Sequence, residues 1–309
     1  MSKEKAKIIS IVGPTASGKS DFAVWLAKKV HGEIISTDSR QVYRGLDIGT
    51  GKITQKEMRG VPHHLLDICN PKKIFTVDDF KTEALKKITD IHSRNKTPIL
   101  CGGTGFYNDV VIYNTSLPYI PPNPKLRRKL ETYSLAQLQK TLLALDKNRY
   151  REIDIKNKVR LIRAIEIAKS LGKVPALTSN PLYDTLVIGV MRDPLILKKR
   201  IEKRLITRLQ MGMIDEVKNL HNKGLSWKRM EMLGLEYRYI ARFLQKKISK
   251  EQMIDNLKKE IWHYAKRQMT WFKKNKQIIW VEPKDIKTIT LIISTFLSNR
   301  KGGPCKGLC

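Results

Sequence analysis

Residues 13–20 read Gly-Pro-Thr-Ala-Ser-Gly-Lys-Ser, which matches the phosphate-binding pattern G-x-x-x-x-G-K-[ST] at every fixed position. Gly13 and Gly18 allow backbone angles that turn successive N–H groups toward an anion. Lys19 supplies a positive charge for the outer phosphate, and the Ser20 hydroxyl suits Mg²⁺. The residues that we expect at the phosphates are Gly13, Thr15, Ala16, Ser17, Gly18, Lys19 and Ser20. The segment therefore predicts a site for a di- or triphosphate, with Mg²⁺ as its cofactor.

The sequence on either side of this loop argues against a chance match of the motif. An apolar run at residues 8–12 precedes the loop and predicts a strand. After the loop, apolar side chains recur at a spacing of three to four residues up to residue 30, which predicts a helix. A phosphate-binding loop requires this strand–loop–helix context. The helix also directs the positive end of its dipole at the same place.

Two other polar segments follow predicted strands. Residues 37–41 include Asp38, a candidate general base for an attacking amine, although a carboxylate here is equally common as a turn former. Residues 102–105 read Gly-Gly-Thr-Gly, which brings backbone N–H groups and the Thr104 hydroxyl close to a charged substrate. No acidic residue follows the strand at 98–101, where nucleotide-hydrolysing enzymes usually hold Mg²⁺ and position water. This absence weakens the hypothesis that the protein hydrolyses a nucleotide.

The order of the predicted elements indicates an α/β protein with a P-loop-type parallel sheet flanked by helices. We expect strands at residues 8–12, 33–36, 98–101, 185–190 and 277–281. We expect helices at residues 20–30, 77–93, 195–210, 214–223, 250–274 and 286–298. Strands that alternate with helices are typical of parallel sheets, whose ligands bind at the carboxyl ends of the strands. One cleft could therefore hold the three polar loops.

An all-helical subdomain interrupts this pattern. A proline-rich break at residues 117–124 precedes a segment that is helical throughout to about residue 171. Residues 120–180 contain 14 Lys and Arg against 5 Asp and Glu, a balance that suits nucleic acid. We therefore predict a catalytic core at residues 1–119 and 181–300, a helical insertion at 120–180, and a flexible tail at 301–309.

The whole chain is strongly basic and contains few cysteines. Its 309 residues include 60 Lys and Arg but only 29 Asp and Glu, a net charge of +31 that favours a polyanionic partner such as nucleic acid. General basicity of the source proteome is the alternative. The four cysteines have no metal-ligand spacing, and no segment approaches the ~20 apolar residues of a membrane span. We expect a reduced, cytoplasmic protein that acts as a monomer and does not bind a membrane.

Six ordered blocks of the sequence together resemble the tRNA dimethylallyltransferases, also called isopentenylpyrophosphate transferases. These blocks lie at residues 13–20, 38–43, 47–52, 62–67, 102–107 and 266–271. The resemblance implies transfer of a dimethylallyl group from dimethylallyl diphosphate to N6 of adenine 37 in the tRNA anticodon stem-loop. Pyrophosphate is released, so the phosphate-binding loop holds a leaving group rather than ATP. An RNA base must be turned out of its loop to enter such a site.

The resemblance also implies roles for individual residues. Asp38 would accept the N6 proton, Thr104 would hydrogen-bond near the bridging oxygen, and Arg204 is a weaker candidate for the diphosphate. The residues implied at the tRNA are Asp38, Ser39, Arg40, Gln41, Thr104, Arg127, Val159, Arg160, Leu161, Ile162, Arg163, Tyr237 and Arg238. Before the long helix such sequences often read Gly-Tyr-Arg, whereas this chain has Glu236 at the glycine position. The chain thus departs from the family pattern at a position where glycine would allow backbone angles that Glu does not.

Three other functions share part of this pattern. A P-loop nucleotide kinase would also have the loop and the α/β core, but it would consume ATP. An adenylate dimethylallyltransferase would alkylate free AMP, for which the basic insertion has no use. A non-catalytic RNA-binding protein with a vestigial loop would need no general base at Asp38.

Overall fold

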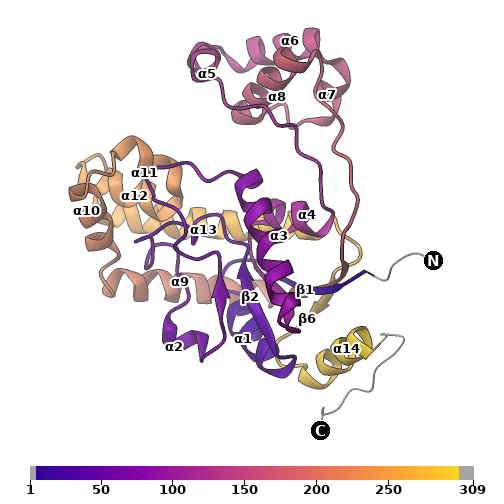
Figure 1. The fold of residues 1–309 in the computed structure, drawn as a ribbon. Coiled ribbons are helices and arrows are strands. Elements are labelled where there is room, and N and C mark those ends of the chain that lie inside the picture. Colours follow the sequence, from indigo (N-terminus) through magenta and orange to yellow (C-terminus); the bar gives the residue numbers. More distant parts are fainter. Residues whose placement is uncertain (1–4, 299–309) are drawn as a thin grey trace. The chain divides into compact units, whose positions relative to one another are not determined.

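The computed structural model describes residues 5–298, and its core is a parallel sheet (Figure 1). The strands run in the order β3-β2-β4-β1-β5-β6, and every neighbouring pair is parallel. Their bounds are β1 Lys7–Val12, β2 Gly32–Ser36, β3 His63–His64, β4 Thr97–Gly102, β5 Asp184–Val190 and β6 Ile279–Val281. The apolar runs of β1 and β2 are buried at every position, as expected for parallel strands covered on both faces. The predicted α/β fold class is confirmed.

Helices account for most of the remaining described residues. In the first half of the chain they are α1 Lys19–Lys29, α2 Gln55–Met58, α3 Val77–Ser93, α4 Gly105–Ile112, α5 Pro124–Glu131, α6 Leu135–Leu145, α7 Lys147–Glu152 and α8 Lys158–Leu171. In the second half they are α9 Pro194–Gln210, α10 Met213–Asn222, α11 Trp227–Leu233, α12 Leu235–Leu244, α13 Lys250–Phe272 and α14 Ile286–Ser298. Capping boxes begin α3 at Thr76 and α13 at Ser249, which explains why both starts could be predicted from the sequence.

Two clusters of buried apolar side chains pack the helices of the core against one another and against the sheet. One cluster joins β1, β2, β4 and β5 to α1 and α14 on one face of the sheet. The other joins α9–α13 into a helical lobe that also takes in the segment after β2, including Tyr43 and Leu46. On the opposite face of the sheet, the Ser10 hydroxyl donates to Asn108 of α4 (3.1 Å). The carboxyl ends of β1, β2 and β4 meet at one edge, since Val12 pairs with Gly102 and Ser36 with Cys101.

The helical insertion forms a compact unit of its own. It comprises Thr115–Asn180, whereas the rest of the chain forms the other unit, so the compact unit begins before the expected residue 120. Its core packs apolar side chains of α5, α6 and α8, among them Leu138, Leu142 and Leu161. The side chains of Asn123, Ser134 and Asn157 each accept a hydrogen bond from a backbone N–H at a helix start. The predicted tail at 301–309 lies outside the described residues.

Several elements were not predicted from the sequence. β3 has only two residues, and α2 has only four, so neither shows a periodic pattern. α4 begins inside the glycine-rich turn at Gly105, and α11 and α12 are separated by Gly234 alone. The Glu236 that departs from the family pattern lies within α12, so the backbone there is helical.

Candidate active site

The phosphate-binding loop has the backbone that its sequence predicts. Gly13 and Gly18 have positive φ angles of 149° and 97°, and Ala16 adopts a left-handed conformation (φ 63°). A Cβ atom on Gly13 would lie 2.5 Å from the Val190 carbonyl oxygen, so only glycine fits between the loop and β5. The Ser17 hydroxyl is buried and has no hydrogen-bond partner among the described residues. The loop is therefore preformed, and it carries a polar group that a phosphate oxygen could satisfy.

Two arginines hold the loop from its carbonyl side. Arg192 donates to the Ser17 carbonyl, and Arg200 of α9 donates to the Ala16 carbonyl (both 2.8 Å). These bonds fix the carbonyl groups outward, which leaves the N–H groups of the loop available for an anion. Sequence reasoning missed both arginines because they lie more than 170 residues from the loop.

Lys19 lies within a cationic environment. Burial lowers the pKa of its ammonium group, the Cys101 thiol and Asp38 oppose this shift, and Arg204 and Arg208 strengthen it. Burial likewise lowers the pKa of Arg204 to about 10, with Arg208 and Arg200 adding to the effect. Arg204 lines a cavity of about 150 Å³ together with Gly18, Lys19 and Ser20, where the sequence prediction put it. Three cations, Lys19, Arg200 and Arg204, line this cavity against two carboxylates, Asp21 and Glu57, so the balance of charge favours an anion.

Gln268 of α13 connects the phosphate-binding loop to the glycine–threonine turn. Its carbonyl oxygen accepts from the Thr15 N–H (2.8 Å), and its amide nitrogen donates to the Gly103 carbonyl (2.8 Å). A Cβ atom on Gly103 would lie 2.2 Å from this amide nitrogen, so the turn needs glycine here. The side chain is buried, and it sets the spacing between the two loops. Sequence reasoning did not identify it.

Asp38 and Thr104 come together at the carboxyl ends of β2 and β4. One oxygen of Asp38 accepts from the Arg40 N–H (2.8 Å), while the Thr104 hydroxyl accepts from the Ser39 N–H (3.2 Å) and donates to the Ser39 hydroxyl (3.4 Å). Tyr264 of α13 also hydrogen-bonds to Thr104, and burial raises the pKa of its phenol. The two predicted catalytic residues are thus linked through the 38–40 segment. Each is held by backbone contacts, so each is preorganised.

A cavity of about 340 Å³ lies between the phosphate-binding loop and the 38–40 segment, and Thr104 is not among the described residues that line it. It is lined by the loop residues Thr15 and Lys19, by Asp38, Ser39 and Arg40, by Gly49, Thr50 and Arg208, by residues 232–238, and by Ile261, Tyr264, Arg267 and Gln268. Phosphate-binding groups and the candidate base therefore face one space. Gln41 lies at its margin, where its side chain donates to the Gly51 carbonyl (3.4 Å) and accepts from the Ser36 hydroxyl (3.4 Å).

Among the residues implied at the tRNA, Tyr237 is not free to contact RNA with its side chain. It is 1% exposed, and its hydroxyl donates to Glu216 (2.8 Å). Glu216 in turn accepts from the N–H groups of Asp47, Ile48 and Gly49. Tyr237 therefore supports the 47–49 turn from inside the helical lobe, which corrects the expectation of a tRNA contact. Its neighbour Arg238 lines the cavity.

In the helical unit, the implied tRNA contacts divide into surface and core. Leu161 and Ile162 pack in the apolar core of the unit, so their side chains do not face RNA, contrary to the expectation. Val159 and Arg160 are exposed. Arg127 and Arg163 both pair with the buried Glu166, which is 1% exposed. Burial raises the pKa of Glu166, but hydrogen bonds from Arg127, the Asn123 N–H and Arg163 outweigh this effect and lower it overall. Both arginines therefore stabilise the unit as well as carrying charge.

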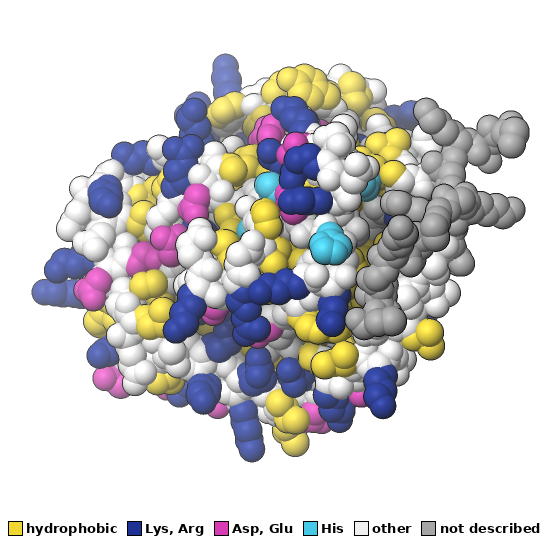
Figure 2. Space-filling model, turned by 60° about the horizontal axis from the view of Figure 1, so that its bottom comes forward, with side chains coloured by type: hydrophobic (Ala, Val, Ile, Leu, Met, Phe, Trp, Pro, Cys, Tyr) yellow, Lys and Arg dark blue, Asp and Glu magenta, His cyan; other side chains and the backbone are white. Residues whose placement is uncertain are grey.

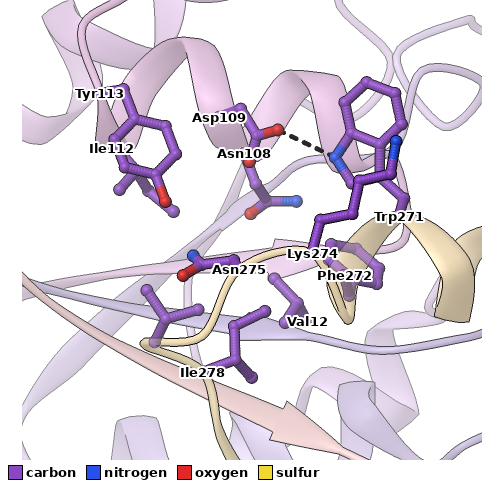
Figure 3. Close-up of a pocket in the computed structure, with 11 residues that line it drawn as sticks. Val12, Asn108, Asp109, Ile112, Tyr113, Trp271, Phe272, Lys274, Asn275 and Ile278 are labelled. Atoms are coloured by element: carbon purple, nitrogen blue, oxygen red, sulfur yellow. Dashed lines mark hydrogen bonds between the residues drawn. The ribbon is translucent and has the colours of Figure 1, made fainter. Parts of the chain in front are cut away.

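A second cavity, of about 250 Å³, lies between α4 and α13 (Figure 3). The Trp271 indole donates to Asp109 (2.9 Å) at its wall, and burial raises the pKa of this carboxyl group, with the indole opposing. A Cβ atom on Gly105 would lie 2.2 Å from the Trp271 ring, so the glycine lets α13 approach the start of α4. None of the catalytic residues predicted from the sequence lines this cavity. The contacts at its wall instead join α13 to α4, which begins next to Thr104.

The residues at the loop could bind an Mg²⁺ ion that takes some of its ligands from a bound phosphate group. Ser20 lies at the cavity beside Lys19 and can supply one hydroxyl ligand, and the carboxylates of Asp21 and Glu57 line the same cavity. Within residues 5–298, no group of three or more His, Cys, Asp or Glu side chains could hold a metal ion. Mg²⁺ commonly binds to few protein ligands and takes the others from phosphate and water. The donor set therefore suits an ion that arrives with a diphosphate.

The parallel sheet, the preformed loop and the cavity shared by Lys19 and Asp38 define a P-loop-type α/β protein. The model of the IPP transferase family matches residues 41–275 of the chain. This chain belongs to the IPP transferase family. Within residues 5–298, no helix is both long and apolar enough to cross a membrane.

Sequence relatives cover nearly the whole chain. The tRNA dimethylallyltransferase 2 of Treponema denticola is 45% identical over 277 residues, which are 88% of this chain and 93% of the relative. The tRNA dimethylallyltransferase 1 of Syntrophus aciditrophicus is 42% identical over 291 residues, with coverage of 91% and 95%.

Solved structures agree with these relatives. The tRNA isopentenylpyrophosphate transferase of Bacillus halodurans has a TM-score of 0.72 and 38% identity, and the match covers 95% of this chain and 96% of that protein. A eukaryotic dimethylallyltransferase studied acting on tRNA has a TM-score of 0.81 and 27% identity, with coverage of 98% and 81%.

Proposed function

We propose that this protein transfers a dimethylallyl group from dimethylallyl diphosphate to N6 of adenine 37 in tRNA and releases pyrophosphate. The observation that carries the proposal is the single cavity shared by Lys19 of the phosphate-binding loop and by Asp38. A donor diphosphate held at the loop would point its reactive carbon into the space that Asp38 lines. The names of the relatives, which are tRNA dimethylallyltransferases, support the same reaction.

The proposed chemistry needs two functions from the protein. As the N6–carbon bond forms, the allylic carbon–oxygen bond breaks and its electrons pass to the pyrophosphate oxygens. Lys19, the loop N–H groups and Arg204 would stabilise this charge, a role that the shared cavity of Lys19 and Arg204 supports. Asp38 accepts the proton that leaves N6. The Thr104 hydroxyl, which donates to the Ser39 hydroxyl in the free protein (3.4 Å), would turn its proton to the bridging oxygen. Because the loop already has its anion-binding conformation before binding, little reorganisation is needed when the charge develops.

The proposed acceptor explains the basic residues around the cavity and in the helical unit. Ser39, Arg40 and Gln41 would hold the adenine that is turned out of the anticodon loop. Arg127, Val159, Arg160, Arg163 and Arg238 are the exposed or partly exposed residues left for the RNA backbone. Contacts of this kind give affinity through phosphates, while the cavity supplies specificity for the base.

We further propose that Mg²⁺ enters with the diphosphate, that Ser20 contributes a ligand, and that the protein works as a cytoplasmic monomer. When bound, the ion would neutralise part of the charge on the leaving pyrophosphate. Removal of Mg²⁺ with EDTA is expected to weaken pyrophosphate binding, and a Ser20→Ala variant is expected to need more Mg²⁺ for half-maximal binding. A Mg²⁺ dependence equal to that of the original protein would contradict the role of Ser20.

Incubation with labelled dimethylallyl diphosphate and Mg²⁺, with either tRNA or AMP, tests the main proposal. We expect label in tRNA at adenine 37, pyrophosphate in equal amount, and no need for ATP. Label in AMP at a comparable rate would instead indicate an adenylate dimethylallyltransferase. Phosphate transfer from ATP without prenylation would indicate a nucleotide kinase.

A further inference from the structure

Two charged side chains that the reaction does not use face each other at the cavity. Arg208 of α9 and Glu236 of α12 form an ion pair in which the shortest nitrogen–oxygen distance is 3.5 Å. Their side chains are only 14% and 19% exposed, and both line the cavity that Lys19 and Asp38 share. The ion pair therefore lies in the cavity that we propose for the donor and the acceptor, and not on the outer surface.

Arg208 is the last of three arginines along one face of α9. Arg200, Arg204 and Arg208 are spaced by four residues, so they lie on the same side of the helix. Arg200 is firmly bound to the loop carbonyl at 2.8 Å, whereas Arg208 reaches the Gly49 carbonyl only at 3.5 Å. A charge-assisted hydrogen bond is normally about 2.7–2.9 Å long, so both polar contacts of Arg208 are loose.

The backbone beside Arg208 is shaped to admit its guanidinium group. A Cβ atom on Gly51 would lie 1.7 Å from a terminal nitrogen of Arg208 and 3.0 Å from one of Arg204. Gly51 also has a positive φ angle of 58°, which an L side chain rarely adopts. The glycine thus keeps open the place where these two arginines approach the 47–51 turn.

The groups around Glu236 shift the pKa of its carboxyl group in opposite directions. Burial raises the pKa of its carboxyl group and Asp38 adds to this, while Arg208 and Arg204 oppose it. A buried carboxylate beside a phosphate site weakens the binding of a polyanion unless a cation compensates for it. A purely structural role for the pair is not needed, because the bond from Tyr237 to Glu216 and the apolar core already fix α12.

We propose that Glu236 is a positioning residue that competes with the donor diphosphate for Arg208. In the free protein Glu236 pairs with the Arg208 guanidinium at 3.5 Å in the wall of the cavity. When a diphosphate enters beside Lys19, Arg208 exchanges the carboxylate for a phosphate oxygen. The competition limits the affinity for pyrophosphate and so favours release of this product. The inference rests on the proposed function, because it requires a diphosphate at the loop.

Calorimetric titration with pyrophosphate and Mg²⁺ tests this exchange without any tRNA. The variants are Glu236→Gln, Arg208→Gln and the double variant, with Glu83→Gln, which removes one charge from an exposed pair with Lys86, as the control. We expect Glu236→Gln to bind pyrophosphate several-fold more tightly and Arg208→Gln to bind it about tenfold more weakly. In the Arg208→Gln background, Glu236→Gln should change the affinity less than twofold. The control should bind as the original protein does.

Steady-state kinetics with tRNA provides a second readout. Tighter binding of pyrophosphate predicts that Glu236→Gln has a lower KM for the donor, together with stronger inhibition by added pyrophosphate. An unchanged or weaker affinity for pyrophosphate in Glu236→Gln would overturn the inference, as would an equal effect with and without Arg208. If the original protein itself did not bind pyrophosphate, the proposed function would fail instead. Melting temperatures within a few degrees of one another would exclude a loss of folding as the cause.

Discussion

At the scale of single residues, Asp38 is held so that one of its oxygens is engaged while the cavity remains open beside it. Replacing it with Asn keeps an acceptor for the Arg40 N–H but removes the base. We expect kcat to fall by about 10²–10⁴, the usual contribution of a general base, with the Kd for tRNA changed less than threefold. Single-turnover transfer and a filter-binding assay measure the two quantities.

Asp38→Ala is the informative comparison, because it removes the base and also the acceptor that shapes the 38–40 turn. It should lose at least as much activity as Asp38→Asn and bind tRNA more weakly. Transfer by Asp38→Asn at the original rate would rule out Asp38 as the base.

Gln268 leads to a different prediction, because it touches both loops through its amide. Gln268→Leu removes the acceptor for the Thr15 N–H and the donor to the Gly103 carbonyl. Buried groups left without partners each cost about 1–3 kcal/mol, so we expect a lower melting temperature and a kcat lowered at least tenfold. Gln245→Leu, which breaks only a bond from the residue after α12 to the Ala241 carbonyl, serves as the control in the same melting and transfer assays. Equal losses in the two variants would show that Gln268 does not position the loops.

The residues of the candidate site differ in how far the sequence alone could predict them. The loop at 13–20 and the polar segments that contain Asp38 and Thr104 could be placed after strands because local spacing defines them. The catalytic roles of Asp38 and Thr104 stay predictions. Gln268 and Arg208 lie on helices whose sequence shows only an apolar face and a charged one. Their roles depend on which loop each helix crosses, and that is set by tertiary packing.

At the scale of secondary structure, Glu33 links β2 to its surroundings. This buried carboxylate contacts Arg94, Lys96 and His64, which lie at the end of α3, before β4 and in β3. The Arg94 hydrogen bonds, followed by those of Lys96 and His64, hold the pKa of Glu33 far below its ordinary value of 4.5 although burial opposes them. Glu33→Gln should therefore lower the free energy of unfolding at pH 7 by about 1–3 kcal/mol.

The pH dependence of this effect has a definite sign. A carboxyl group whose folded-state pKa is depressed stabilises the fold above its unfolded pKa, and that stability is lost as the pH falls toward the folded value. The difference between the original protein and Glu33→Gln should thus be constant from pH 7 to about 5.5 and shrink below about 4.5. Urea unfolding at several pH values measures it. A difference that grows on acidification would contradict the assignment.

Helices with a clear periodic pattern were predicted with the right bounds, whereas short helices and strands without such a pattern were missed. The bounds of α3 and α14 match the expected residues 77–93 and 286–298. β3 consists of two histidines that pair with β2 only because the 61–67 segment returns to the sheet edge. α11 and α12 were not predicted, since the turn at Gly234 divides them and each is short.

At the scale of the whole molecule, the excess of positive charge is the feature that a small donor cannot explain. Lys and Arg side chains are spread over the face seen in Figure 2 and exceed Asp and Glu there. The sequence carries +31 in total, and the donor site needs only a few cations. A polyanion that covers a large part of the surface is the partner such a distribution favours.

Salt should therefore separate the two substrates. Each phosphate contact made by Lys or Arg releases counterions, so affinity for RNA falls with a log–log slope of about −0.7 to −0.9 per contact. If six or more contacts form, raising the salt from about 50 to 200 mM should weaken tRNA binding about 10³-fold. Binding of Mg²⁺–pyrophosphate, which involves a few partly buried cations, should weaken far less because buried charges are screened poorly. Fluorescence titrations of both ligands across this range measure the two slopes, and parallel slopes would show that the basic surface does not contact the tRNA.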